Sequence, residues 1–87
     1  MLRVSKSVEL TETDDGAFLL DTVRGIYWHL NWVGVQVIQG IQNGLKISEI
    51  SSLVASECDA DDETVQADII QLLKKLKKAR LVRKEFP

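Results

Sequence analysis

The stretch Gly25-Ile26-Tyr27-Trp28-His29-Leu30-Asn31 decides the fold, because an aromatic-rich run ends there in a helix-capping residue. Aromatic and β-branched side chains favour extended backbone, so we expect a strand over about residues 25–30. Alternation places Ile26, Trp28 and Leu30 on one face, expected to be core, and Tyr27 and His29 on the other. Asn31 should cap a helix that follows directly.

Two more strands are expected before this one. Polar and apolar residues alternate from Val4 to Leu10, as in a half-exposed strand. Asp14-Asp15-Gly16 has the composition of a hairpin turn leading into a strand at Ala17–Leu20, and a second turn covers residues 22–25. The sequence therefore predicts a three-stranded antiparallel sheet.

Three helices are expected after the sheet. The first runs from Asn31 to Asn43-Gly44, and its Gly34 and Gly40 cost about 1 kcal/mol each relative to Ala, so another group should pack closely against them. The second covers about residues 48–57, with inward positions at Ile47, Ile50, Leu53 and Val54.

The third helix is the most strongly patterned. Asp61 is its N-cap, and apolar residues recur at 4-3-4-3 spacing over about residues 62–79: Val65, Ile69, Leu72, Leu76 and Ala79. Ile70 and Leu73 widen this stripe, which could then contact both a core and a neighbouring groove, although a fully buried helix would show the same pattern. The chain then closes with a short strand or packed tail formed by Leu81, Val82 and Phe86.

An aromatic strand and an apolar helix together suggest a peptide-binding groove. A strand at the edge of a sheet can pair with one more strand from a partner, and an adjacent helix can hold that partner's alternate side chains. The expected function class is therefore binding.

Composition narrows the alternatives. The 87 residues suffice for one small domain, residues 1–87, with a single core. A net charge of −2 gives no general attraction to nucleic acid, and the segregation of carboxylates at residues 57–68 from cations at 74–84 fits helix electrostatics. No apolar run is long enough to cross a membrane, and no signal-peptide pattern is present.

Few residues could support chemistry. The lone Cys58 excludes an internal disulfide and fits a reducing, cytoplasmic location. One His and one Cys cannot complete a usual zinc site, and no nucleotide-binding motif occurs. We therefore expect no cofactor, no metal site and no catalytic residue.

Ordered features along the chain resemble the PqqD-like leader-peptide-binding family. They are Leu30-Asn31, Gly34, Val37-Ile38, Ile41, Asn43-Gly44, Ile47-Ser48-Glu49-Ile50, then Val65-x-Ala67-Asp68-Ile69-x-x-Leu72-Leu73-x-x-Leu76 and Leu81-Val82. The resemblance extends from about Gly16 onward. Val33 departs from the small hydroxyl residue usual at its position, and Arg80 departs from the glycine that usually ends the third helix.

The resemblance implies an α+β fold that is winged-helix-like, with a three-stranded antiparallel sheet followed by three helices. It further implies a non-enzymatic adaptor of ribosomally made and modified peptides, most like the stand-alone leader-binding protein of lasso-peptide pathways. Its partners would be a precursor leader peptide and a separate leader peptidase, with no nucleic acid and no membrane. The oligomeric state would be a monomer or a weak dimer through the edge strand.

The leader-binding residues that follow from this combined reasoning lie on the third strand and the third helix. They are Gly25, Ile26, Tyr27, Trp28, His29, Val65, Asp68, Ile69, Leu72, Leu73 and Leu76. Asp68 either faces water, caps backbone or binds the leader, since a carboxylate in an apolar stripe is costly unless solvated or paired. The cations at 74–84 are either solvated surface or a docking patch for acidic leader residues or the peptidase.

Two other function classes stay open at this point. The second and third helices also suit a winged-helix DNA-binding protein, although Asp61, Asp62 and Glu63 would repel phosphates at the end of a recognition helix. An enzyme would need Cys58 and His29 to meet beside an orienting group.

Overall fold

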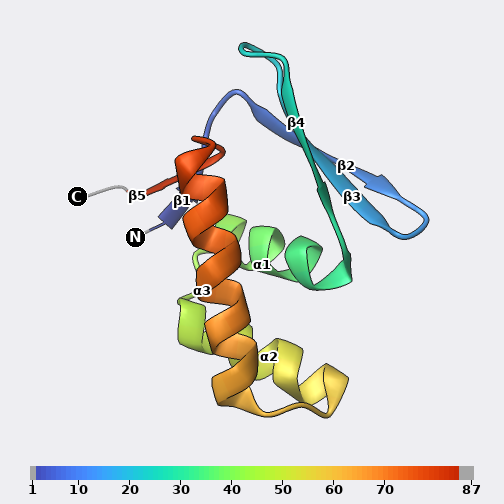
Figure 1. Cartoon of the computed structure of the whole chain (residues 1–87), viewed down its shortest axis with the longest axis vertical. Coiled ribbons are helices and arrows are strands. Elements are labelled where there is room, and N and C mark those ends of the chain that lie inside the picture. The colour runs from blue at the N-terminus through green and yellow to red at the C-terminus, as the bar shows by residue number, and fades with distance from the viewer. Residues whose placement is uncertain (1, 85–87) are drawn as a thin grey trace.

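A three-stranded antiparallel sheet followed by three helices makes up most of the fold, as the sequence predicts (Figure 1). The computed structural model describes residues 2–84. Its elements, in chain order, are β1 (Leu2–Val4), β2 (Val8–Thr13), β3 (Gly16–Asp21), β4 (Ile26–Leu30), α1 (Trp32–Gln42), α2 (Ile47–Cys58), α3 (Asp62–Lys78) and β5 (Val82–Lys84).

The sheet is a meander in the order β2-β3-β4. Its register pairs Leu19 with Leu10 on one side and with Trp28 on the other. Since side chains directly opposite one another share a face, one face carries Leu10, Leu19 and Trp28 and packs toward the helices. The opposite face carries Phe18, Leu20, Tyr27 and His29.

The alternating pattern correctly predicted which residues of β4 share a face, but the residues on the inner face are less buried than expected. Leu30 is buried, at 2% exposure, whereas Trp28 is only half-buried and Ile26 is 37% exposed. The expectation that all three are core is therefore wrong for Ile26 and only partly right for Trp28.

Helix α1 begins and ends as expected. The Gly34 N–H donates to Asn31 Oδ1 at 3.0 Å, which satisfies one of the free amides of the first turn. A Cβ added at Gly34 would lie 2.9 Å from Leu30 Cδ2, and one added at Gly40 would lie 2.6 Å from Ile50 Cγ1. The two glycines thus allow β4 and α2 to approach α1 closely, which confirms the predicted close packing.

The other two helices differ from expectation in detail. Glu49 Oε1 accepts a hydrogen bond from the Lys46 N–H at 2.9 Å and so supports the start of α2, whose cap the sequence left ambiguous. Leu53 was expected to face inward, but it is 53% exposed, so that expectation is wrong. Asp61 caps α3 as predicted, through the Thr64 N–H at 3.4 Å.

The N-terminal strand predicted at residues 4–10 is in fact two strands. β1 is not part of the three-stranded sheet. It pairs antiparallel with β5, with Val4 opposite Val82. Ser5, in the connection to β2, reinforces this pairing: its N–H donates to Leu81 O at 3.0 Å and its Oγ to Arg80 O at 2.8 Å. The predicted strand or tail near the end is confirmed at Val82–Lys84, while Phe86 lies outside the described residues.

One core joins the sheet, the helices and the β1–β5 pair. Its fully or nearly fully buried large side chains are Leu19, Leu30, Val37, Ile38, Ile50, Val54, Ile69, Leu76, Leu81 and Val82. Because β4 packs against β3 and α1, whereas α3 packs against α1, α2 and β5, the backbones of β4 and α3 are not packed closely together.

The end of α3 generates a stability prediction. Arg80 directly follows the C-cap residue Ala79 and adopts the left-handed conformation, with φ +63°. That conformation costs a residue with a Cβ about 1–2 kcal/mol, whereas glycine adopts it freely.

We expect Arg80→Gly to raise the free energy of unfolding by about 0.5–1 kcal/mol, after allowing for the extra entropy that glycine adds to the unfolded chain. Lys78→Gly, inside the last helical turn, should instead lower it by about 1 kcal/mol. Urea denaturation of the two variants measures both effects, and equal effects would contradict the prediction.

Candidate functional site

Strand β4 lies at the edge of the sheet. Within residues 2–84 it pairs with β3 and with no other strand. Alternate residues of an edge strand direct their N–H and C=O groups away from the sheet, so β4 presents backbone donors and acceptors on its free side.

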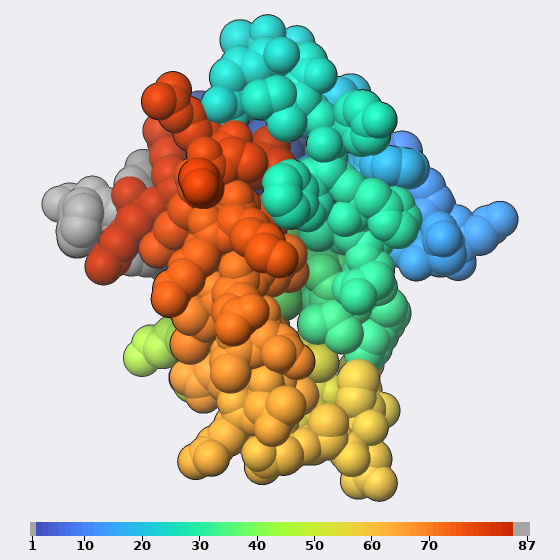
Figure 2. Space-filling model, in the orientation of Figure 1, coloured from blue at the N-terminus to red at the C-terminus, as the bar shows by residue number. Residues whose placement is uncertain are grey.

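Helix α3 borders this free side (Figure 2). In Figure 1, α3 runs upward in front of α1, with β4 to its right. The buried residues of α3 face α1, away from the viewer of Figure 1. A right-handed helix turns by about 100° per residue, so the flank of α3 toward β4 carries Asp68, Leu72, Lys75 and Ala79. We call these four residues the β4-facing stripe. Leu72 and Ala79 are half-buried, whereas Asp68 and Lys75 are exposed.

The predicted site residues fall into two groups. Gly25, Ile26, Tyr27 and His29 are exposed, as is Asp68, and Trp28 and Leu72 are half-buried at the margin of the core. The remaining four residues of α3 are buried, with exposures of 9% or less: Val65, Ile69, Leu73 and Leu76. These four belong to the core, and the helix surface that remains accessible on the side of β4 is the β4-facing stripe.

A hydrogen-bonded bridge connects the start of β4 to the end of α3. The carboxylate of Asp21, 1% exposed, accepts from the N–H groups of Val23 and Arg24 at 3.0 and 3.1 Å, and from Arg24 Nε at 2.8 Å. Arg24 Nη2 then donates to Ala79 O at 2.9 Å. This Asp21–Arg24–Ala79 bridge ties the turn before β4 to the C-terminal end of α3.

The bridge also determines how Asp21 titrates. The side-chain hydrogen bond from Arg24, followed by the backbone hydrogen bond from the same residue, lowers the pKa of Asp21 to about 2 from its ordinary value of 3.8. Sequence reasoning missed both residues. The available signal was a carboxylate on the core-facing side of a strand, three residues before an arginine.

The outer face of the sheet carries an aromatic cluster next to the β4 edge. The ring of Phe18 meets those of Tyr27 and His29 edge-on, at centroid distances of 5.9 and 5.0 Å. His29 Nε2 lies 3.8 Å from Asp15 Oδ1. A strand added to β4 would place alternate side chains beside this cluster. Phe18 was not among the predicted site residues.

The opposite edge of the sheet is different in character. Strand β2 carries Glu9 and Glu12, and the hairpin that follows it carries Asp14 and Asp15, all exposed. Charged side chains discourage further pairing at a sheet edge. Of the two edges, β4 is therefore the better suited to accept a strand.

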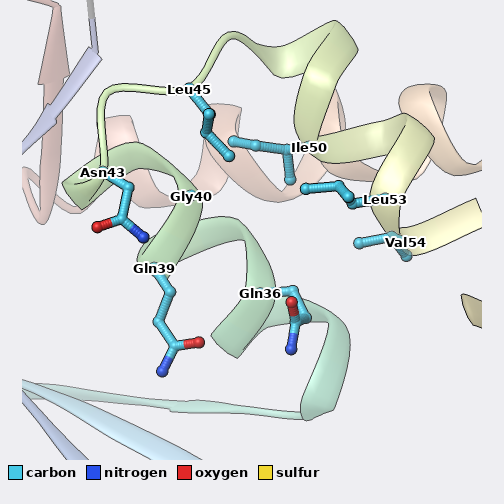
Figure 3. Close-up of a pocket in the computed structure, with 8 residues that line it drawn as sticks. All are labelled: Gln36, Gln39, Gly40, Asn43, Leu45, Ile50, Leu53 and Val54. Carbon is cyan, nitrogen blue, oxygen red and sulfur yellow. The ribbon is translucent and has the colours of Figure 1, made fainter.

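A separate pocket of about 130 Å³ lies between α1 and α2 (Figure 3). Side-chain amides of α1 and apolar side chains of α2 and its preceding loop line it, among them Gln36, Gln39, Ile50 and Leu53. None of the predicted site residues belongs to this pocket.

The described residues contain no cluster of three or more His, Cys, Asp or Glu side chains arranged to hold a metal ion. Cys58 is exposed at the end of α2, whereas His29 lies in β4. No helix among residues 2–84 has the length and apolar character needed to cross a bilayer.

Comparison with known proteins gives one family and two closely similar structures. The sequence model of coenzyme PQQ synthesis protein D (PqqD) matches residues 16–82. A solved structure described as TbiB1 in complex with the TbiA(beta) leader peptide superposes with a TM-score of 0.86 and 26% identity, covering 98% of this chain and 99% of that one.

A second solved structure, described as lasso peptide synthetase B1 complexed with the leader peptide, has the same TM-score of 0.86. It is 25% identical and covers 95% of this chain and 98% of its own. No curated protein matches the sequence.

The Asp21–Arg24–Ala79 bridge generates a prediction about acid stability. A carboxyl group whose pKa is lower in the folded state stabilises the fold above its unfolded pKa and loses that contribution as the pH falls through the folded value. For Asp21 the loss should occur as the pH falls from about 4 to about 2.

We expect Asp21→Asn to remove this part of the acid dependence. Arg24→Ala should shrink it, because without the main cause of the lowered pKa the folded-state pKa of Asp21 returns toward its ordinary value of 3.8. Urea denaturation between pH 6 and pH 2 measures the stability of each protein. An unchanged acid profile in both variants would show that the bridge does not hold in solution.

Proposed function

The chain belongs to the PqqD family, and on that premise we propose that it is a non-catalytic adaptor that binds the leader segment of a ribosomally synthesised precursor peptide, of the lasso-peptide type. The two similar structures support this, since each is described as a complex with a leader peptide and each matches nearly the whole chain. On this proposal the whole chain acts as one leader-recognition domain.

The observation that carries the proposal is the free edge of β4 beside the β4-facing stripe of α3. The leader adds to β4 as a fourth strand through main-chain hydrogen bonds. Its alternate side chains then point to the two faces of the extended sheet. One set lies over Trp28 and Leu72, and the other lies beside Tyr27 and His29.

The energies are adequate for specific binding. Burying two large apolar leader side chains contributes roughly 1.5–3 kcal/mol each, in addition to the strand pairing. Ordering an extended peptide opposes this gain, so a dissociation constant near micromolar, about −8 kcal/mol, is expected.

In its pathway the adaptor presents the bound leader to a separate leader peptidase and itself makes no covalent change. No cofactor is required for strand addition. We further propose that the protein is cytoplasmic and is a monomer or a weak dimer. A dimer formed through the β4 edge would compete with the leader, because the same edge is assigned to the leader.

Strand addition generates a prediction about the peptide backbone. We expect the leader of the cognate precursor to bind saturably, at roughly micromolar concentration, in a fluorescence anisotropy titration. Methylating one leader amide at a time should weaken binding at every second residue, because alternate amides donate to β4. The absence of saturation at tens of micromolar protein would refute leader binding, and a scan without this period would refute strand addition.

Side-chain substitutions generate a second prediction. Tyr27→Ala and Leu72→Ala should each weaken leader affinity roughly threefold to thirtyfold, because both side chains border the added strand. Leu73→Ala should instead destabilise the fold by about 2–5 kcal/mol, since Leu73 is 3% exposed. Lys84→Ala serves as the control with unchanged affinity. Anisotropy and urea denaturation separate the two effects, and equal affinity losses in all four variants would mean that the groove lies elsewhere.

A further inference from the structure

The groove between β4 and α3 is electrically polarised along its length. The β4-facing stripe carries one carboxylate, Asp68, and one ammonium group, Lys75, with half-buried Leu72 between them. The hydrogen bond from Arg24 to Ala79 O fixes the C-terminal end of α3 beside the start of β4, so strand and helix run in opposite directions. Lys75 therefore lies toward the Ile26 end of β4, and Asp68 toward the Leu30 end.

Neighbouring charges reinforce this polarity. The first turn of α3 carries Asp62 and Glu63 after the cap Asp61, whereas its last turns carry Lys75, Lys77 and Lys78. The guanidinium of Arg24 is already occupied by the buried carboxylate of Asp21. Within residues 2–84, neither Asp68 nor Lys75 makes an ion pair, so both charges face the solvent that a bound peptide would replace.

From this arrangement we propose that the groove selects leader segments by charge order, with a basic residue over Asp68, an apolar residue over Leu72 and an acidic residue over Lys75. Asp68 and Lys75 are seven residues apart, or about 10.5 Å along a helix. The helix-facing residues i and i+4 of a strand are about 13 Å apart, and the flexible lysine stem accommodates the difference. The recognised pattern is therefore basic-x-apolar-x-acidic.

The pattern also has a direction along the peptide. Antiparallel pairing is slightly more stable per residue than parallel pairing, so the added strand runs opposite to β4 and parallel to α3. Its basic residue then comes first in the sequence and its acidic residue last. The part of the precursor after the leader strand leaves the groove at the turn formed by residues 22–25.

This inference rests on the proposed function, and the experiment separates the two. Random peptides displayed on their encoding messenger RNA are selected against the wild-type protein and against the charge-reversed variant Asp68→Lys/Lys75→Glu. The wild type should enrich peptides with a basic residue before, and an acidic residue after, an apolar centre, and the variant should enrich the reverse order. Circular dichroism verifies that the variant is folded.

The wild-type consensus peptide and a twin with its two charges exchanged then provide a quantitative test. The wild type should bind the consensus roughly fivefold to tenfold more tightly than the twin, because exposed charge pairs each contribute modestly. The variant should prefer the twin, and both preferences should shrink at about 1 M salt, where the Debye length falls to about 3 Å.

Equal affinities for the two peptides at low salt would overturn the charge-order inference and leave leader binding intact, provided that Tyr27→Ala still weakens both. If no selected peptide depends on Tyr27 or Leu72, the groove itself is wrong, and the proposed function fails together with the inference.

Discussion

The buried carboxylate of Asp21 is the constraint on which the arrangement of strand and helix depends. It holds the turn after β3 through two backbone N–H groups and orients Arg24, which donates to the carbonyl oxygen of Ala79, the C-cap of α3. A buried carboxylate is costly unless it is hydrogen-bonded and paired, and here both conditions are met. The bridge lets β4 and α3 lie side by side without packing tightly against each other. The flank of each that faces the other is thus not closely packed against it.

Local signals in the sequence predicted much of this structure. Asn31 and Asp61 have capping side chains whose partners lie within three residues. Gly34 and Gly40 predicted that other elements pack closely against α1. Alternation likewise identified which residues of β4 share a face. It could not tell that Ile26 extends beyond the helices, because periodicity gives the direction of a side chain but not what covers it.

Long-range contacts account for what the sequence did not reveal. The Asp21–Arg24–Ala79 bridge joins residues 55 positions apart, and the pairing of β1 with β5 joins the two ends of the described chain. Neither leaves a periodic pattern in the sequence. The same limit applies to the candidate site: the apolar stripe of α3 was recognised, but only the fold shows that Val65, Ile69 and Leu73 are buried while Leu72 is half-buried.

The β1–β5 ribbon has a consequence for how the molecule folds. Its strands are three residues long and lie about eighty positions apart, so closing this pair carries a larger loop entropy than closing the β2–β3 or β3–β4 hairpin. The ribbon should form after the sheet and helices have assembled, and its amides should be among the first to exchange with solvent. Because it lies next to the end of α3, its opening would loosen the helix end at which Ala79 O accepts the hydrogen bond from Arg24.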